Sequence, residues 1–443
     1  MLSRLGFFGV SRSAFGVLAM ATEDVTSAIS RGIRSERKRD RVGLILPSPW
    51  TQRSVNPVAV MGTPPTVTAG AASGNTSVST SISGAQRITI TTVDAAGNPL
   101  LRTFGGNVAV DPSTSPYNFF SPTTRADPWG FEFEIDIRSE GKAFEVILRG
   151  KDSKYRIWVN EQWVTTGAIA GPSSAGLWYD YRVEFASTGT YRIRVEGLIG
   201  QQMGGVWVDP LDTVWAPPTL AGPRWIVAGD SWTAGTGATG LGLESFATRL
   251  RDVTGVTDTW AVGVSGGGYL NPGSGSPGTL RSRLNAEVLA FDPDVVVCAI
   301  GTNDYLLYTP AAIEAECRLT YAQIQAHSPK PALIVVGPWY VSGFPSAPFV
   351  LARDAIRKAA ADFADLYIDT IGGPYPYSGN TADYSNTGII TGTGKAGDPK
   401  GNGNGDVYMS ADGSHPSTAG HAAIARWLGA SILAHLQNNG GAL

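Results

Sequence analysis

Apolar and polar residues alternate along several short segments between positions 86 and 214. These segments are 131–138, 144–149, 155–159, 181–185 and 191–195. Alternation places successive side chains on opposite faces of a strand, so each segment is predicted to have one buried and one solvated face. Many short strands without intervening helices predict an antiparallel β-sandwich of jelly-roll-like type.

From about residue 224 the pattern changes, because continuous apolar runs begin to alternate with helical stretches. The apolar runs are 224–228, 295–300 and 333–336, and the helical stretches are 243–253, 280–291, 311–326, 350–364 and 417–436. Buried strands that alternate with helices are typical of a parallel sheet with crossover helices. The second half of the chain is therefore predicted to be an α/β domain.

These two patterns and a Pro-Pro pair at 217–218 divide the chain into three predicted parts. Residues 1–65 form an N-terminal extension, with a helix expected from about residue 22 to 39 and a Pro-rich linker after it. Residues 66–218 form the β-sandwich domain, and residues 219–443 form the α/β domain. Because the sandwich has its own apolar face, we expect it to fold independently.

Composition narrows the classes of function. Charged residues make up 16% of the chain and the formal net charge is −3, so the basic face that nucleic acid requires is not expected. There are two cysteines, and no Cys/His spacing is typical of a zinc site, so neither a metal nor a cofactor is expected. No apolar run reaches the length of a transmembrane helix. Residues 1–21 resemble a secretory signal in part, but Arg12 interrupts them, which favours an amphipathic anchoring segment.

Four short polar motifs follow one another in the second half of the chain. They are Gly229-Asp230-Ser231, Ser265-Gly266, Gly301-Thr302-Asn303-Asp304 and Asp412-Gly413-Ser414-His415. The first and third directly follow predicted strands, and parallel strands bring such residues to one edge of the sheet. Serine, histidine and aspartate are the residue types of a nucleophile, its general base and the group that orients that base. We therefore expect Ser231, His415 and Asp412 to be catalytic.

This ordered set resembles the SGNH (GDSL-type) serine hydrolase family, whose name lists four catalytic residue types. The resemblance runs from residue 224 to about 437 and implies a three-layer, flavodoxin-like domain. It implies that Asp412 and His415 share one short loop. It also implies an oxyanion hole formed by the Ser231 and Gly266 amides and the Asn303 side chain.

Several of these residues have alternative interpretations. Gly263 or Gly267 could donate to the oxyanion in place of Gly266. Asp412 to Pro416 could form only a turn followed by a helix start. The remaining histidines, which are expected to be structural, are His327, His421 and His435.

Aromatic residues that follow the motifs or strand ends are candidate substrate contacts, with ordinary loop packing as the alternative. They are Trp232, Tyr269, Trp339 and Tyr340. In the sandwich, Trp158 and Trp207 are expected in the core. Trp163 and Trp178 lie in turn-rich stretches and are candidate sugar contacts, again with packing as the alternative. The Gly-, Asn- and Asp-rich segment 375–409 is either an excursion or a wall of the substrate cleft.

The sequence predicts a serine esterase that acts on an acylated glycan, most simply by removing O-acetyl groups. This glycan would come from a cell envelope or from another source. The order of jelly roll and SGNH domain resembles certain carbohydrate esterases. A lipid or mycolyl esterase is the alternative within the same chemistry, although segment 237–243 is too short for an apolar lid. The chain also resembles phage tail proteins, in which residues 1–65 would bind other virion tail proteins and the SGNH domain would serve host-surface binding. The protein is accordingly expected outside the cell or in a virion.

Overall fold

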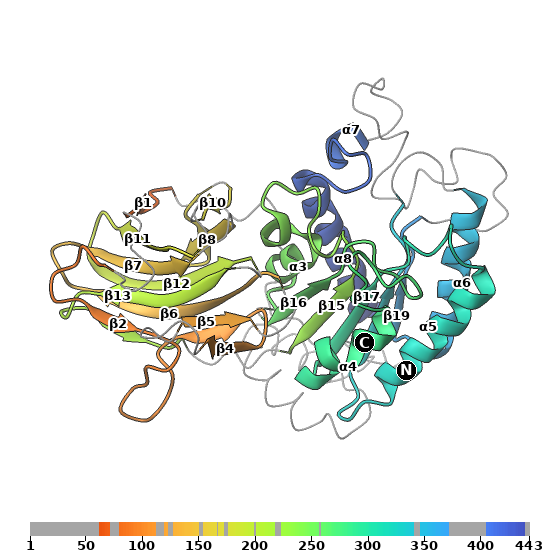
Figure 1. The fold of residues 1–443 in the computed structure, drawn as a ribbon, viewed down its shortest axis with the longest axis horizontal. Coiled ribbons are helices and arrows are strands. Elements are labelled where there is room, and N and C mark those ends of the chain that lie inside the picture. Colours follow the sequence, from red (N-terminus) through yellow and green to blue (C-terminus); the bar gives the residue numbers. More distant parts are fainter. Residues whose placement is uncertain are drawn as a thin grey trace, which may run out of the picture.

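The chain forms two bodies that lie side by side, one rich in strands and one containing both helices and strands (Figure 1). The computed structural model describes residues 62–70, 79–111, 119–122, 127–149, 154–165, 167–171, 176–198, 201–217, 223–256, 258–340, 346–371 and 405–438. Most of the predicted N-terminal extension and most of segment 375–409 lie outside these residues, as does Pro218.

The strand-rich body is an antiparallel β-sandwich, as predicted. In spatial order, one sheet contains β1 (Thr66–Ala69), β11 (Trp178–Glu184), β7 (Ala143–Arg149), β13 (Gln202–Val208), β5 (Phe119–Pro122) and β4 (Val108–Asp111), with β2 (Gln86–Ile88) paired to β13. The other contains β10 (Ile169–Ala170), β8 (Lys154–Val159), β12 (Gly189–Gly197), β6 (Trp129–Ile137) and β14 (Thr213–Trp215). In this sheet β3 (Arg102–Phe104) pairs with β6, and β9 (Gln162–Trp163) pairs with β8.

The apolar alternation of β6 explains the core of the sandwich. Phe131, Phe133 and Ile135 are fully buried and face the second sheet, because residues two apart share one face of a strand. Phe144 of β7 meets Phe133 edge to face, with ring centroids 5.5 Å apart. The two sheets are therefore joined by one continuous apolar layer that contains only residues of the sandwich.

The second body is built on a parallel sheet. Its strands lie in the order β16 (Thr259–Gly263), β15 (Trp225–Gly229), β17 (Val295–Ala299), β18 (Ala332–Val336) and β19 (Leu366–Ile368). All neighbouring pairs are parallel. Numbered along the chain, this order is 2-1-3-4-5, which is the flavodoxin-like order. The strand after β15 is added on one side of it and the later strands on the other, so the topological switch point lies between β15 and β17.

Helices cover both faces of this sheet and complete the three predicted layers. Helices α3 (Phe246–Thr254) and α8 (Thr418–Asn438) pack with Trp225 and Val227, on one face of β15. Helices α4 (Leu280–Glu287), α5 (Pro310–Gln325) and α6 (Ala347–Phe363) pack with Ile226 and Ala228, on the other face. The short helices are η3 (Leu241–Glu244), η4 (Leu289–Phe291) and α7 (Gly405–Tyr408). None of the helices in the described ranges combines the length and apolar character needed to cross a membrane.

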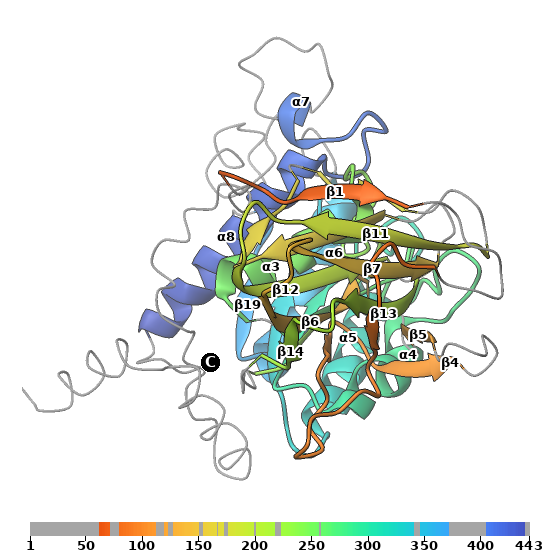
Figure 2. The same cartoon turned by 90° about the vertical axis from the view of Figure 1, so that its left-hand side faces the viewer.

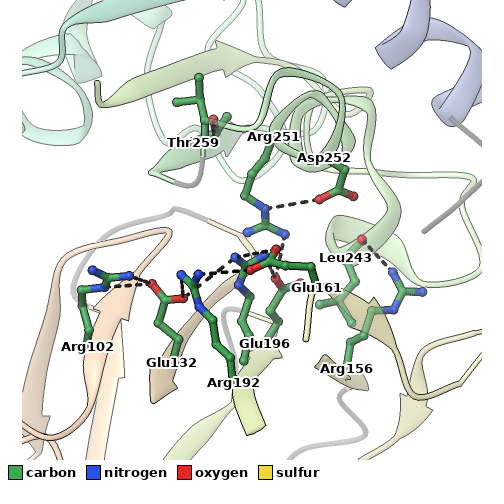
Figure 3. Close-up of polar contacts among 12 residues, drawn as sticks. Arg102, Glu132, Arg156, Glu161, Arg192, Glu196, Leu243, Arg251, Asp252 and Thr259 are labelled. Carbon is green, nitrogen blue, oxygen red and sulfur yellow. Dashed lines mark hydrogen bonds and ion pairs between the residues drawn. The ribbon is translucent and has the colours of Figure 1, made fainter. Parts of the chain in front are cut away.

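The predicted solvated face of β6 and β12 is instead buried in part. Glu132 and Glu196 are almost fully covered, and Arg251 of α3 lies 2.7 Å from a carboxylate oxygen of Glu196. Figure 3 shows these charged side chains gathered between the two bodies. Viewed from the sandwich side, strands β1, β11, β7 and β13 lie in front of the α/β body (Figure 2). The alternation predicted strands correctly, but it could not show that a second body covers their polar face.

Candidate active site

Ser231 lies in a tight turn directly after β15. Gly229 ends the strand, and a Cβ at this position would lie 2.6 Å from the Ala299 carbonyl oxygen and would overlap the Thr233 hydroxyl. Only glycine fits there without displacing the neighbouring strand. The Thr236 amide then donates to the Ser231 carbonyl at 3.0 Å, which turns the chain over the sheet edge. The Ser231 hydroxyl is thereby presented at the carboxyl edge, where open α/β sheets bind ligands.

Ser231, His415 and Asp412 form a continuous hydrogen-bonded chain. His415 Nε2 lies 2.9 Å from Ser231 Oγ, although the two residues are 184 positions apart in the sequence. On the other side of the ring, His415 Nδ1 lies 2.7 Å from Asp412 Oδ2. The structure therefore brings together the three residues that the sequence singles out as catalytic candidates.

The loop that carries Asp412 and His415 is closed by its own hydrogen bonds. The Ser410 amide donates to the His415 carbonyl at 2.8 Å, and Gly413 has a positive φ of 65° that suits the tight turn between them. The Oδ1 atom of Asp412 accepts hydrogen bonds from the Ser414 and His415 amides at 2.8 and 3.0 Å. One carboxylate oxygen thus fixes the loop, while the other holds the imidazole.

These bonds also determine the charge of Asp412. Partial burial acts to raise its pKa, but hydrogen bonds from Ser414, His415 and Ser410 outweigh it and hold the pKa of Asp412 well below its usual range. Asp412 is therefore a carboxylate at neutral pH and can only accept hydrogen bonds. This requires His415 Nδ1 to carry a proton, which leaves Nε2 of the neutral ring free to accept the Ser231 proton.

The oxyanion-hole candidates occupy the neighbouring strand ends. Asn303 Nδ2 donates to the Gly267 carbonyl at 2.9 Å, so the Asn303 carboxamide is held against the turn that follows β16. Gly266 lies in this turn with a φ of 70°. The Gly267 amide already donates to Val264 at 2.8 Å, and Gly263 is packed within β16 against Ala234. Among the three glycines considered from the sequence, this geometry favours Gly266 as a donor.

Two buried aspartates support the loops of the site. Asp304 accepts hydrogen bonds from the Tyr269, Leu270 and Asn271 amides at 2.7, 3.1 and 2.9 Å, and burial raises its pKa. Asp230 accepts the Trp232 amide at 2.9 Å, and burial raises the pKa of Asp230 to about 7. Both carboxyl groups therefore hold loop amides.

Most of the aromatic candidates for substrate contact pack inside the protein. Tyr269 is fully buried, and its hydroxyl lies 2.6 Å from that of Tyr321. Trp232 and Trp339 are 2% exposed and stack on one another with ring centroids 5.4 Å apart. Tyr340 is half-buried and packs against a phenylalanine ring of α6. Tyr269, Trp232 and Trp339 are therefore packing residues and not exposed substrate contacts.

The sandwich tryptophans behave in a similar way. Trp163 and Trp178, the candidate sugar contacts, are each only 1% exposed, so the packing alternative describes them as well. Trp163 lies beneath the Arg156 guanidinium, which is 3.5 Å from the ring centroid. Trp158 is buried as expected, whereas Trp207 is half-buried and packs beside Trp178. Turn-rich sequence did not reveal that neighbouring elements cover these rings.

Sequence reasoning named Trp232 and His421 but missed the contacts that they make around the site. The Trp232 indole donates to the Ser414 carbonyl at 3.1 Å. His421, expected only to be structural, is fully buried and bonds to the Phe246 amide and the Thr236 carbonyl, each at 3.1 Å. Across the described ranges, no group of three or more His, Cys, Asp or Glu side chains could hold a metal ion.

A flavodoxin-like sheet with a hydrogen-bonded serine, histidine and aspartate at its carboxyl edge is typical of a serine hydrolase of the SGNH type. Comparison with known families agrees, because residues 227–423 match the model of the GDSL-like Lipase/Acylhydrolase family. This part of the chain is a domain of that family, and the protein is an esterase. No curated protein matches the sequence.

Solved structures with a similar fold include two carbohydrate esterases. A family two carbohydrate esterase from Clostridium thermocellum, in complex with cellohexaose, aligns with a TM-score of 0.53 at 16% identity and covers 77% of this chain and 99% of its own. An acetyl xylan esterase from the rumen bacterium Butyrivibrio proteoclasticus aligns with a TM-score of 0.53 at 13% identity and covers 81% of this chain and 99% of its own.

A salicylyl-acyltransferase from a tetracycline biosynthetic pathway is similar to the same extent. It aligns with a TM-score of 0.52 at 14% identity and covers 76% of this chain and 95% of its own. Matches of this extent include both bodies, since the α/β body alone accounts for about half of the chain. A similar fold over parts of both bodies is therefore shared with these proteins.

Proposed function

We propose that this esterase removes acyl groups, most simply O-acetyl groups, from a glycan by a Ser231–His415–Asp412 mechanism. The observation that carries the mechanism is the short chain of contacts from Asp412 Oδ2 to His415 Nδ1 and from His415 Nε2 to Ser231 Oγ, at 2.7 and 2.9 Å. These distances are within the range needed for proton transfer between a nucleophile and its base.

In the first step, Ser231 Oγ bonds to the ester carbonyl carbon while its proton passes to His415 Nε2. The carbonyl electron pair moves onto oxygen, and the Ser231 and Gly266 amides with the Asn303 carboxamide donate to this oxyanion. Asp412 stabilises the imidazolium that forms. Collapse of the intermediate breaks the bond to the alcohol oxygen, which takes the proton from His415.

The acyl group is then carried on Ser231. A water molecule gives a proton to His415 Nε2 and attacks the acyl carbon through the same oxyanion hole. The second intermediate expels Ser231 Oγ, which takes the proton back from His415, and the carboxylic acid leaves. Every proton in this cycle moves through His415 Nε2, so proton transfer needs no side chain beyond Ser231, His415 and Asp412.

The preference for a glycan ester is supported by shared architecture. The fold of this chain is similar to the carbohydrate esterases of Clostridium thermocellum and Butyrivibrio proteoclasticus over almost the whole length of those two proteins. The lipid or mycolyl esterase alternative lacks support in the loop after Ser231, where Leu241 is the large exposed apolar residue and the segment packs against the protein. The glycan is therefore the better proposal for the alcohol part of the substrate.

The biological setting stays a proposal based on sequence. An enzyme acting on an envelope glycan could be secreted, or it could be carried on a phage tail through residues 1–65, with its SGNH domain binding or deacylating the host surface. Mass spectrometry of purified virions and of secreted protein separates these two settings.

The decisive test is hydrolysis of p-nitrophenyl esters from acetate to palmitate beside acetylated polysaccharides, with Ser231→Ala as the matched inactive variant. We expect release of acetate from a polysaccharide, a preference for the shortest aryl ester, and no activity in Ser231→Ala. The variant should unfold like the natural protein, because it loses one hydroxyl at a strand end. A preference for palmitate would support the lipid esterase, and activity retained in Ser231→Ala would refute the nucleophile.

A further inference from the structure

The chain that leaves Ser231 passes between the sandwich and the loop that carries His415. We call residues 236–246 the connecting segment; it contains η3 and ends at the first residue of α3. His421 of α8 fixes both ends of this segment, because its ring bonds to the Thr236 carbonyl and the Phe246 amide. The connecting segment is thus attached to the helix that begins directly after the His415 loop.

The connecting segment also touches His415 itself. Gly237 has a φ of 91°, and a Cβ at this position would lie 2.8 Å from the Cβ of His415 and would overlap the Pro416 carbonyl. The connecting segment is therefore packed directly against the His415 loop, with no room for a side chain between them.

Glu244 joins the connecting segment to α8. Its side chain is buried, and Oε2 accepts hydrogen bonds from the Gly240 amide at 2.8 Å and the Thr418 hydroxyl at 3.3 Å. The Thr418 hydroxyl also accepts the Thr239 amide at 2.8 Å. Thr418 is the first residue of α8 and lies three positions after His415. One carboxylate thus links the segment that follows the nucleophile to the helix that follows the base.

The charge of Glu244 is balanced from the other body. Arg156 of β8 donates from Nη2 to Glu244 Oε1 at 2.6 Å and from Nη1 to the Leu243 carbonyl at 3.3 Å. Figure 3 shows Arg156 reaching from the sandwich toward Leu243. Arg156 is fully buried and its guanidinium lies over the Trp163 ring, so it has no alternative position in solvent. Lys154 of the same strand donates to the Thr239 carbonyl.

We propose that Arg156 and Glu244 are positioning residues for the esterase reaction: the sandwich, through this ion pair, holds the connecting segment and the start of α8, and so sets His415 against Ser231. The inference rests on the role proposed above for His415. It gives the sandwich a part in catalysis that does not require it to touch the substrate.

The physical basis is the cost of a buried unpaired charge. Without Arg156, the Glu244 carboxylate would lose its nearest compensating charge inside the protein, and only Arg249 of α3, 3.7 Å from Oε1, would still face it. Removing one partner of a buried ion pair is strongly unfavourable. The connecting segment would relax so that water reaches Glu244, and His415 would move with it. A displacement of about 1 Å between reacting groups can lower the rate by about 100-fold.

The test uses the full chain and a small aryl acetate, which is too small to need a binding surface on the sandwich. Arg156→Met removes the charge while keeping the length of the side chain. Thr418→Val removes the hydroxyl link to Glu244 but leaves the ion pair intact, and Thr418→Ser restores the hydroxyl. Arg102→Met is the matched control, because Arg102 pairs with Glu132 within the sandwich at 2.8 Å.

The readouts are kcat and KM for the aryl acetate, the rate at which a fluorophosphonate labels Ser231, and the melting temperature. We expect Arg156→Met to lower kcat and the labelling rate together by about 10- to 100-fold, with KM changed less than threefold. Thr418→Val should also lower kcat and the labelling rate, and Thr418→Ser should recover most of that loss. Arg102→Met should leave kcat and the labelling rate within about twofold of the natural protein.

The inference is overturned if Arg156→Met folds and keeps its kcat and labelling rate within twofold of the natural protein. It is also overturned if Arg102→Met loses as much activity as Arg156→Met, since the loss would then follow general destabilisation. Should Arg156→Met fail to fold, Thr418→Val and Thr418→Ser decide the outcome. Failure of the proposed function is distinct, because the natural protein itself would then hydrolyse no ester or Ser231→Ala would remain active.

Discussion

The Nε1 atom of Trp232 donates to the carbonyl oxygen of Ser414 at 3.1 Å. Trp232 directly follows Ser231, and Ser414 directly precedes His415, so this bond joins the neighbours of the two reacting residues. The Trp232 ring also stacks on Trp339 with an angle of 6° between the planes. A buried indole thereby fixes the distance between two loops that the sequence places far apart.

Trp232→Phe tests this bond. The ring would still stack, but the Ser414 carbonyl would lose its donor, and a net hydrogen bond is worth about 1 kcal/mol. We expect kcat to fall by about threefold to tenfold and KM to change little. Trp339→Phe is the matched control, because the Trp339 indole nitrogen is buried and donates to none of the described residues. An equal fall in both variants would attribute the effect to ring packing.

Asp412→Asn should lower turnover by more than tenfold, or ~1.4 kcal/mol in the barrier, because the His415 tautomer would no longer be fixed by a carboxylate. Steady-state kinetics on the aryl acetate measures this. Ser410→Ala is the control, since it removes one hydrogen bond to Asp412 Oδ1 at 2.8 Å and leaves the carboxylate in place. A fall of less than tenfold in Asp412→Asn would show that Ser231 and His415 act as a dyad.

Asn303→Ala should lower kcat by about 100- to 1,000-fold, because one donor to the oxyanion is lost. The loss should appear in kcat with KM nearly unchanged, since the interaction forms only in the transition state. Asn271→Ala is the control, because Asn271 Nδ2 donates to the Asn303 backbone carbonyl at 3.3 Å. This substitution removes that bond but leaves the Asn303 carboxamide intact. Equal losses in both variants would assign Asn303 a role in loop structure instead.

His421 makes the fold sensitive to acid. Burial lowers the pKa of His421 to about 4 from its ordinary value of 6.5, so the unfolded chain binds a proton at this residue before the folded protein does. Stability is therefore complete above pH 6.5 and falls as the pH drops toward 4, by at most about 3 kcal/mol from this residue.

Unfolding by urea at pH 7 and at pH 4.5 measures this dependence. We expect His421→Gln to be less stable than the natural protein at pH 7, because its hydrogen bonds to Thr236 and Phe246 are altered. The variant should lose less stability than the natural protein on going to pH 4.5. A parallel loss in the two proteins would show that carboxylates elsewhere dominate the acid response.

Local pattern was sufficient for the main helices, for the central strands of both bodies and for half of the site, but it did not predict the edge strands β16 and β19. Alternation in 131–138 predicts β6 because side-chain direction along a strand has a period of two. The apolar run before Gly229 predicts β15 and places Ser231 at its end. Asp412 and His415 lie three positions apart, so their contact is a property of one loop and can be inferred from that loop alone.

The tertiary structure alone decided which distant residues meet and which faces are covered. The contact of Ser231 with His415 spans 184 positions, and the sequence gives only its residue types, through a family resemblance. The turn-rich sequence around Trp163 and Trp178 makes them candidate sugar contacts, but in the folded protein neighbouring elements bury both rings. Arg156 and Glu244 carry no local signal, because a buried ion pair between two bodies depends on how their surfaces dock. Secondary-structure propensity and the spacing of apolar residues act over a few neighbouring residues. Docking of the sandwich on the α/β body depends on the shape and charge of surfaces that exist only after each body has folded.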